Sequence, residues 1–267
     1  GMSAATALIR SLRAEARKTA GLPGVWLGAA LALALPVLVE YYVNHNLADG
    51  LAAGDPRASA RLGDVGVIGL YMGTTGIVVL AASVVVSEYV SDPRTNVDSR
   101  QVTTTMLVQP RRGAAAAAKL MVVLAAALVL LALAWAATFS LCRHLLGPRM
   151  PLGPVPWWML TGILAWWLFS AAASMALAAA TRSAMASMTA PIAMSTMISP
   201  GVLLIKSTDA ARFLPDAAAV RLIADPTTLN YDRLVELLSV PMAAAVCAAW
   251  AGGCAVALCW VWMRRDA

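Results

Sequence analysis

The residues able to do acid–base, nucleophilic or metal chemistry are few in this chain and lie apart from one another. Both histidines, His45 and His144, fall on predicted external segments, and the four cysteines show no metal-ligand spacing. Glu40, Glu88 and Lys119 each sit at the end of an apolar stretch, within reach of water or headgroups. No G-x-x-x-x-G-K-S/T phosphate loop occurs in the 267 residues. We therefore expect no catalytic residue, no metal site and no cofactor in this chain.

The composition explains why so few polar groups are present. Apolar residues make up 60% of the chain and charged residues 13%, and the mean hydropathy is +0.74. Soluble domains carry about twice that charged fraction. The composition therefore excludes an ordinary cytosolic protein, a disordered chain and a disulfide-rich secreted scaffold. We expect a membrane protein in which the net charge of +6 bears on orientation and not on binding of nucleic acid.

Six stretches are long and apolar enough to cross the hydrocarbon core as helices. They run from Gly24 to Val43, Val65 to Ser87, Ala114 to Leu141, Val155 to Thr181, Ala184 to Ile205 and Ser239 to Met263. The sequence thus predicts an all-α integral membrane fold with six transmembrane helices. Residues 1–22 form a cytoplasmic tail with an amphipathic elbow helix, and residues 23–267 form the transmembrane domain.

The charges on the connecting segments predict the orientation. The N-terminus, the 88–119 segment, Arg182 and the C-terminal tail together carry 12 of the 20 basic residues but only five of the 14 acids. Because basic residues accumulate on the cytoplasmic side, both termini are expected there.

The segment before the first span has the pattern of an interfacial helix. Its apolar residues fall within an arc of about 100° opposite the basic ones at 100° per residue. The apolar residues are Ala5, Leu8, Ile9, Leu12 and Ala16, and the basic ones are Arg10, Arg13, Arg17 and Lys18. We expect the basic face to meet anionic membrane lipid, either as a plain anchor or with a mechanical role.

The cytoplasmic segment from Glu88 to Lys119 is far longer than a connection between neighbouring helices needs to be. It is polar and contains no His or Cys. Its acids lie among Pro, Asn and Ser residues, which does not suggest catalysis. The segment is interpreted as a docking surface for a soluble partner, with a solvated connector as the alternative.

Two parts of this region resemble the membrane subunits of ABC-2 (type V) ATP-driven exporters. One is SEY at Ser87–Tyr89, and the other is TTTMLVQPRRGAAAAAKL at Thr103–Leu120. In that family a Glu ends the second span, and a Thr-Thr-x-Leu…Pro-Arg-Arg…Lys run leads into the third. The chain departs from the family where Asp92–Gln101 replaces a shorter Glu-x-x-x-Gly-Thr link.

The resemblance implies a role for these residues and for partners. It assigns contact with a separate ATPase subunit, which would bind ATP and magnesium, to Glu88, Pro110, Arg111, Arg112 and Lys119. It also implies a second copy of this chain as a homodimer partner. The implied function is outward transport of a hydrophobic or amphipathic drug, antibiotic, peptide or lipid across a bacterial cytoplasmic membrane. A membrane-embedded immunity or regulatory protein that binds such a molecule without transport is the alternative.

The two remaining sets of candidate residues lie within the spans. The glycines of the second span share one face, which indicates either packing within the chain or a subunit interface. They are Gly66, Gly69, Gly73 and Gly76. Hydroxyl residues share a face of the fifth span, and either line a translocation path or bond to their own helix's carbonyls. They are Thr189, Ser195, Thr196 and Ser199.

The external segment 206–238 is expected to form short amphipathic helices dipping into the outer leaflet, with Asp209 and Asp216 as capping acids. The segment acts either as a lid over the exit path or as a structural cap.

Overall fold

The computed structural model describes residues 4–55, 58, 62, 65–89, 112–149, 157–195, 199–223 and 232–264. Every regular element within these ranges is a helix. The elements are α1 (Ala4–Ala20), α2 (Pro23–Ala52), α4 (Val67–Met72), α5 (Thr74–Val86), α7 (Arg112–Leu146), η2 (Gly147–Arg149), α8 (Trp157–Thr181), α9 (Ala184–Met194), α10 (Pro200–Leu204), η3 (Asp209–Phe213), α11 (Pro215–Ile223), α12 (Asp232–Leu237) and α13 (Val240–Arg264).

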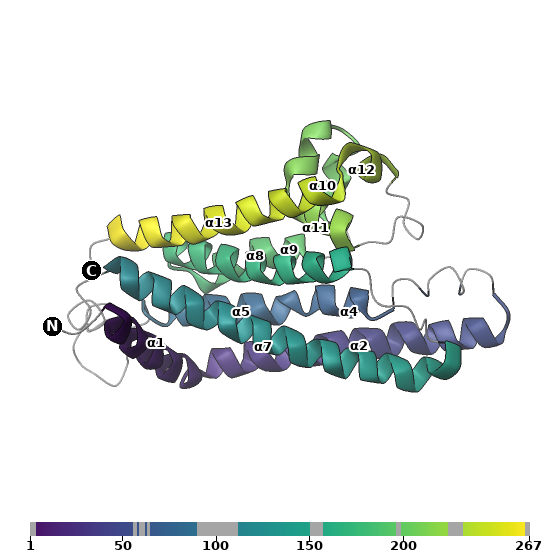
Figure 1. The fold of residues 1–267 in the computed structure, drawn as a ribbon, viewed down its shortest axis with the longest axis horizontal. Helices are drawn as coiled ribbons and strands as arrows, with labels where there is room; N and C mark the ends of the chain where they lie inside the picture. The colour runs from purple at the N-terminus through teal and green to yellow at the C-terminus, as the bar shows by residue number, and fades with distance from the viewer. Residues whose placement is uncertain are drawn as a thin grey trace.

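Within these ranges, five helical segments are long and apolar enough to span a membrane, which indicates a multi-pass membrane protein. They are Pro23–Ala52, Val67–Val86, Gly113–Arg149, Trp158–Thr181 and Val240–Arg264, and they confirm five of the predicted spans as helices. The expected elbow helix is also present as α1. Figure 1 shows the long helices running along one common direction, with α1 and the last turn of α13 at the same end of the bundle.

The prediction of one continuous helix over Ala184–Ile205 is wrong. The segment contains α9, which ends at Met194, and the five-residue α10, which starts at Pro200. A residue before proline is driven out of the helical region, and Ser199 accordingly has extended backbone angles, φ −64° and ψ 128°. The two short helices still return the chain to the end of the bundle at which α8 begins (Figure 1).

The central helices are α4, α5 and α8, most of whose residues are buried. In contrast, only a small share of α2, α7 and α13 is buried, and these helices expose large apolar side chains such as Trp26, Leu133 and Val256. A soluble protein would bury such side chains, whereas a membrane protein can expose them to lipid. The exposed apolar surface therefore agrees with the placement of these helices in a bilayer.

The glycines of α4 and α5 face α2 of the same chain. A Cβ atom at Gly69 would lie 2.5 Å from the carbonyl oxygen of Pro36, and one at Gly73 would lie 2.7 Å from the Pro36 ring. At Gly76 it would overlap the backbone of α2. Small residues let membrane helices approach this closely. These three glycine faces are therefore covered within the chain and leave no room for a second chain at the same place.

Helix α11, in the 206–238 segment that is expected to be external, packs between α8 and α13 with most of its residues buried. Its Asp216 side chain is 1% exposed. The Asp216 carboxylate accepts hydrogen bonds from the Ser199 hydroxyl at 2.7 Å and from the Gly201 N–H at 2.6 Å. Asp216 therefore caps the first turn of α10 as well as lying in the first turn of α11.

Candidate functional site

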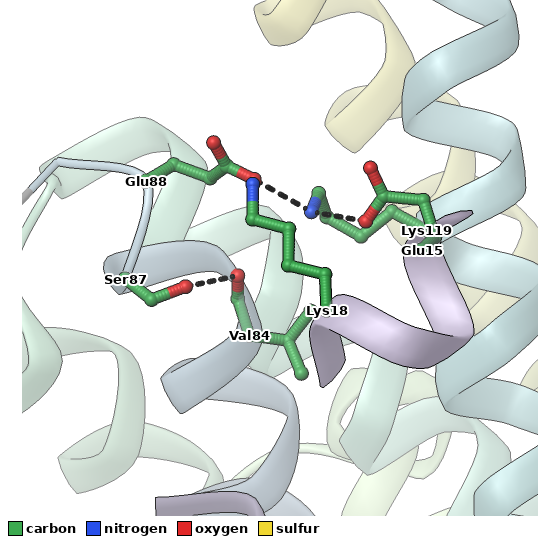
Figure 2. A network of polar contacts seen from close by, with 6 residues as sticks. All are labelled: Glu15, Lys18, Val84, Ser87, Glu88 and Lys119. Atoms are coloured by element: carbon green, nitrogen blue, oxygen red, sulfur yellow. Dashed lines mark hydrogen bonds and ion pairs between the residues drawn. The ribbon is translucent and has the colours of Figure 1, made fainter. Parts of the chain in front are cut away.

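Four charged side chains meet where α1, α5 and α7 come together at the end of the bundle that holds α1. Glu15 and Lys18 come from α1, Lys119 from the first turns of α7, and Glu88 from the turn that follows α5. Figure 2 shows the carboxylates and ammonium groups pointing toward one another. We call these four residues the ion cluster.

Lys119 is the centre of the ion cluster. Its ammonium donates to Glu15 Oε2 at 2.7 Å and to Glu88 Oε1 at 2.8 Å. Lys18 donates to the same Glu88 oxygen. Lys119 and Glu88 are almost completely buried, at 1% and 0% exposure, whereas Lys18 reaches the surface. Two positive and two negative groups thus neutralise one another at a place where an isolated charge would be costly.

The electrostatics of the cluster favour the charged form of Glu88. Burial on its own raises the pKa of this carboxyl group. The attraction of Lys119 and the hydrogen bonds from Lys119 and Lys18 outweigh that effect, and the pKa of Glu88 is lower than its ordinary value. Glu88 is therefore a fixed anion, and the cluster is suited to holding helices together and not to transferring protons.

Aromatic rings extend the cluster to two more elements. The Lys119 ammonium lies 5.9 Å from the centre of the Trp262 ring on α13. Trp262 lies 6.2 Å from the Tyr89 ring, over which the guanidinium of Arg182 sits at 5.3 Å. Arg182 belongs to the turn between α8 and α9. The end of the bundle is thus joined through one connected set of contacts from α1 to α13.

Of the residues assigned to ATPase contact by resemblance, the structure brings Glu88 and Lys119 together. They stand 31 residues apart in sequence and flank the 90–111 stretch, Glu88 just before it and Lys119 two turns into α7 after it. Because both are buried, neither side chain is presented directly to a soluble partner. Pro110 and Arg111 lie outside the described residues, as does the side chain of Arg112, the first residue of α7.

Sequence reasoning missed Glu15 and Lys18 as partners in this cluster. Glu15 is the only acid among residues 1–22. On a helical wheel at 100° per residue, it falls nearer the apolar arc than the arginines. An acid at the edge of the apolar arc of a basic helix was the available signal.

The hydroxyl residues of the fifth predicted span do not share one environment. Thr189 is exposed and donates to its own helix carbonyl at Met185, at 2.7 Å. Ser195 likewise donates to the Pro191 carbonyl at 2.8 Å, and it is also within 3.2 Å of the Thr74 hydroxyl. Ser199 instead bonds to Asp216. Thr196 lies outside the described residues. Bonds to local carbonyls thus account for Thr189 and Ser195 without any substrate.

The expectation that Glu40 lies within reach of water is wrong. Because α2 continues to Ala52, Glu40 is inside the helix and is 0% exposed. Its carboxylate accepts the backbone N–H groups of Gly69 at 2.7 Å and Gly66 at 3.1 Å, and the Asn44 amide at 2.6 Å. These are the N–H groups at the start of α4, which lack partners within the helix. Glu40 therefore caps α4 inside the bundle.

No cluster of three or more His, Cys, Asp or Glu side chains suited to a metal ion occurs in the part of the chain that the structure describes. No protein-family model, no curated protein and no solved structure matches this chain. The class is accordingly set by the fold: an all-helical protein with five long apolar helices able to span a membrane.

Proposed function

We propose that this chain is the membrane-spanning subunit of an ATP-driven exporter of the ABC-2 type in a bacterial cytoplasmic membrane. It moves a hydrophobic or amphipathic molecule outward, and a separate ATPase subunit that binds ATP and magnesium supplies the energy. The resemblance of Ser87–Tyr89 and Thr103–Leu120 to that family supports the proposal. Its structural support is the ion cluster.

The observation that carries the proposal is the connection of Glu88 to Lys119 and of both to α1. A partner that binds between residues 90 and 111 pulls on a segment whose two ends meet at this connection. Glu15 and Lys18 then pass the displacement to α1, and Lys119 passes it to α7. The cluster positions these helices for coupling and does not itself contact ATP.

The second subunit in this proposal is another copy of the same chain. The glycine faces of α4 and α5 are covered by α2, so they are not the contact surface. A more suitable surface is the outer side of α9, where Met185 is 80% exposed and Thr189 is exposed. In this proposal, a path between two copies would pass along this side of α9.

The experiment is reconstitution of the chain, co-purified with an ATPase subunit from native membranes, into liposomes. ATP-dependent movement of a hydrophobic dye out of the compartment equivalent to the cytoplasm is the expected result. Lys119→Gln is expected to lower dye movement per ATP hydrolysed. Arg264→Gln, which removes an exposed charge at the same end of the bundle, is the matched control.

Transport by the chain alone without ATP would contradict the proposal. Binding of the dye without any movement in the presence of the ATPase would favour the regulatory or immunity function instead.

A further inference from the structure

An apolar groove lies between α7 and α8 in the half of the bundle where α7 ends and α8 begins. Its floor is formed by the buried side chains Leu70 and Ile163. Leu131 and Trp135 of α7 form one wall, and Leu160 and Leu164 of α8 form the other. The groove has a volume of about 200 Å³.

The lining is almost entirely apolar. Thr161, its one hydroxyl side chain, donates to the Trp158 carbonyl at 2.9 Å. Apolar cavities of about 150 Å³ in proteins stay dry and take up apolar molecules the size of benzene. The groove is therefore suited to a hydrocarbon and not to water.

The walls are held in place by packing outside the groove. The Trp135 ring meets the Phe139 ring edge-on, with centres 5.7 Å apart at 70°. Phe139 in turn lies against Gly66, where a Cβ atom would be 2.9 Å from the ring. Gly66 has φ +84°, which a glycine adopts without strain. The groove is thus built into the fold before any ligand arrives.

The position of the groove identifies its occupant. Both walls belong to helices long and apolar enough to span a membrane, so the groove adjoins the hydrocarbon of the bilayer. Beyond Trp135, α7 continues to Arg143, about 12 Å farther at 1.5 Å per residue. Arg143 and Arg149 are exposed there. Cationic side chains at this distance from the groove complement the phosphate of a lipid whose acyl chain lies in the groove.

We propose that the groove binds one acyl chain of an anionic phospholipid, with the lipid phosphate against Arg143. The lipid is a bound component of the outer half of the bundle and fills the space between α7 and α8. This site is independent of the proposed export function, because it requires only that α7 and α8 lie in a bilayer.

The test is native mass spectrometry of the purified chain in detergent with added phosphatidylglycerol. Leu131→Trp fills the groove and is expected to weaken lipid retention by at least about tenfold. Leu133→Trp places the same ring on the same helix at a site that is 53% exposed and does not line the groove. It is expected to retain lipid like the unmodified chain. Equal retention by the two variants would overturn the proposal.

Two further measurements separate the parts of the proposal. Arg143→Gln is expected to remove the preference for phosphatidylglycerol over phosphatidylcholine, whose choline cation offsets the phosphate charge. An unchanged preference would overturn the contact between Arg143 and an anionic headgroup. Lipid brominated on the acyl chain is expected to quench the fluorescence of Trp135. The contribution of Trp135 is the difference in quenching between the unmodified protein and Trp135→Phe. If Trp135→Phe is quenched as much as the unmodified protein, the placement of the acyl chain beside Trp135 is overturned. This result does not depend on whether Leu131→Trp folds.

Discussion

Lys119 is a buried cation whose two carboxylate partners both precede it in the sequence, at very different separations. Glu88 precedes it by 31 residues and Glu15 by 104. Removing one member of a buried ion pair leaves an uncompensated charge, which costs more than the pair itself contributes. We therefore expect the loss of one member of the ion cluster to destabilise the fold, whatever the role of the cluster in coupling.

Lys119→Gln is expected to lower the free energy of unfolding by about 3–5 kcal/mol, because Glu15 and Glu88 would remain buried with only Lys18 nearby. Thermal unfolding of the purified chain in detergent measures the change. Arg264→Gln, an exposed charge at the same end, should have little effect. Equal loss of stability in the two variants would argue against the cluster's contribution.

The lowered pKa of Glu88 predicts a particular dependence of stability on pH. A carboxyl group with a lower pKa in the folded state stabilises the fold above its unfolded value, here 4.5. That contribution disappears as the pH falls below this value and through the folded pKa. Glu88→Gln should therefore flatten the acid side of the curve of unfolding temperature against pH. A curve of unchanged shape would show that Glu88 is not held as an anion.

At the scale of elements, α2 and the α4–α5 pair are in closer contact than side chains other than glycine would allow. Gly28 of α2 shows the same closeness from the other side, since a Cβ atom there would lie 2.6 Å from the Leu80 nitrogen. The broken span is held differently: Tyr71 donates to the Met194 carbonyl at 3.0 Å, and Asp216 caps α10. Packing by small residues secures one pair of elements, and polar side chains secure the interrupted one.

Gly76→Ala should destabilise the fold by about 1–3 kcal/mol, because its Cβ would overlap the backbone of α2 at Ala32. Gly252→Ala on α13 is the matched control, since nothing lies within 4 Å of its added Cβ. In a helix that change should be neutral or stabilising by up to about 1 kcal/mol. Thermal unfolding of the two variants side by side tests the contact, and the opposite ranking would contradict it.

For the whole molecule, the orientation inferred from charge predicts that the ion cluster lies on the cytoplasmic side and the α10–α12 region on the outer side. In the structure, α1 and the end of α13 lie together at one end of the bundle while α10 and α11 lie at the opposite end, so the two regions would face opposite sides of a membrane (Figure 1).

In a background lacking the native cysteines, Ser207→Cys should react with a membrane-impermeant maleimide in intact cells. Thr181→Cys, at the end of α8, should react only after the membrane is opened. Both positions are exposed, so accessibility within the fold does not separate them. The reverse labelling pattern would show that the chain has the opposite orientation in the membrane.

The residues by themselves determined the helical class, the elbow helix and five helices long and apolar enough to span a membrane, because hydropathy and helical periodicity are properties of neighbouring residues. Pro200 was also a local signal against a continuous fifth span, because the residue before a proline, here Ser199, disfavours helical backbone angles.

Only the tertiary structure decided which partners those residues have. It joined Lys119 to Glu15, placed Glu40 against the start of α4, and turned Asp216 toward α10. Each of these contacts links elements brought together by packing. The pattern of a single segment, in contrast, contains no information on what faces it across the bundle.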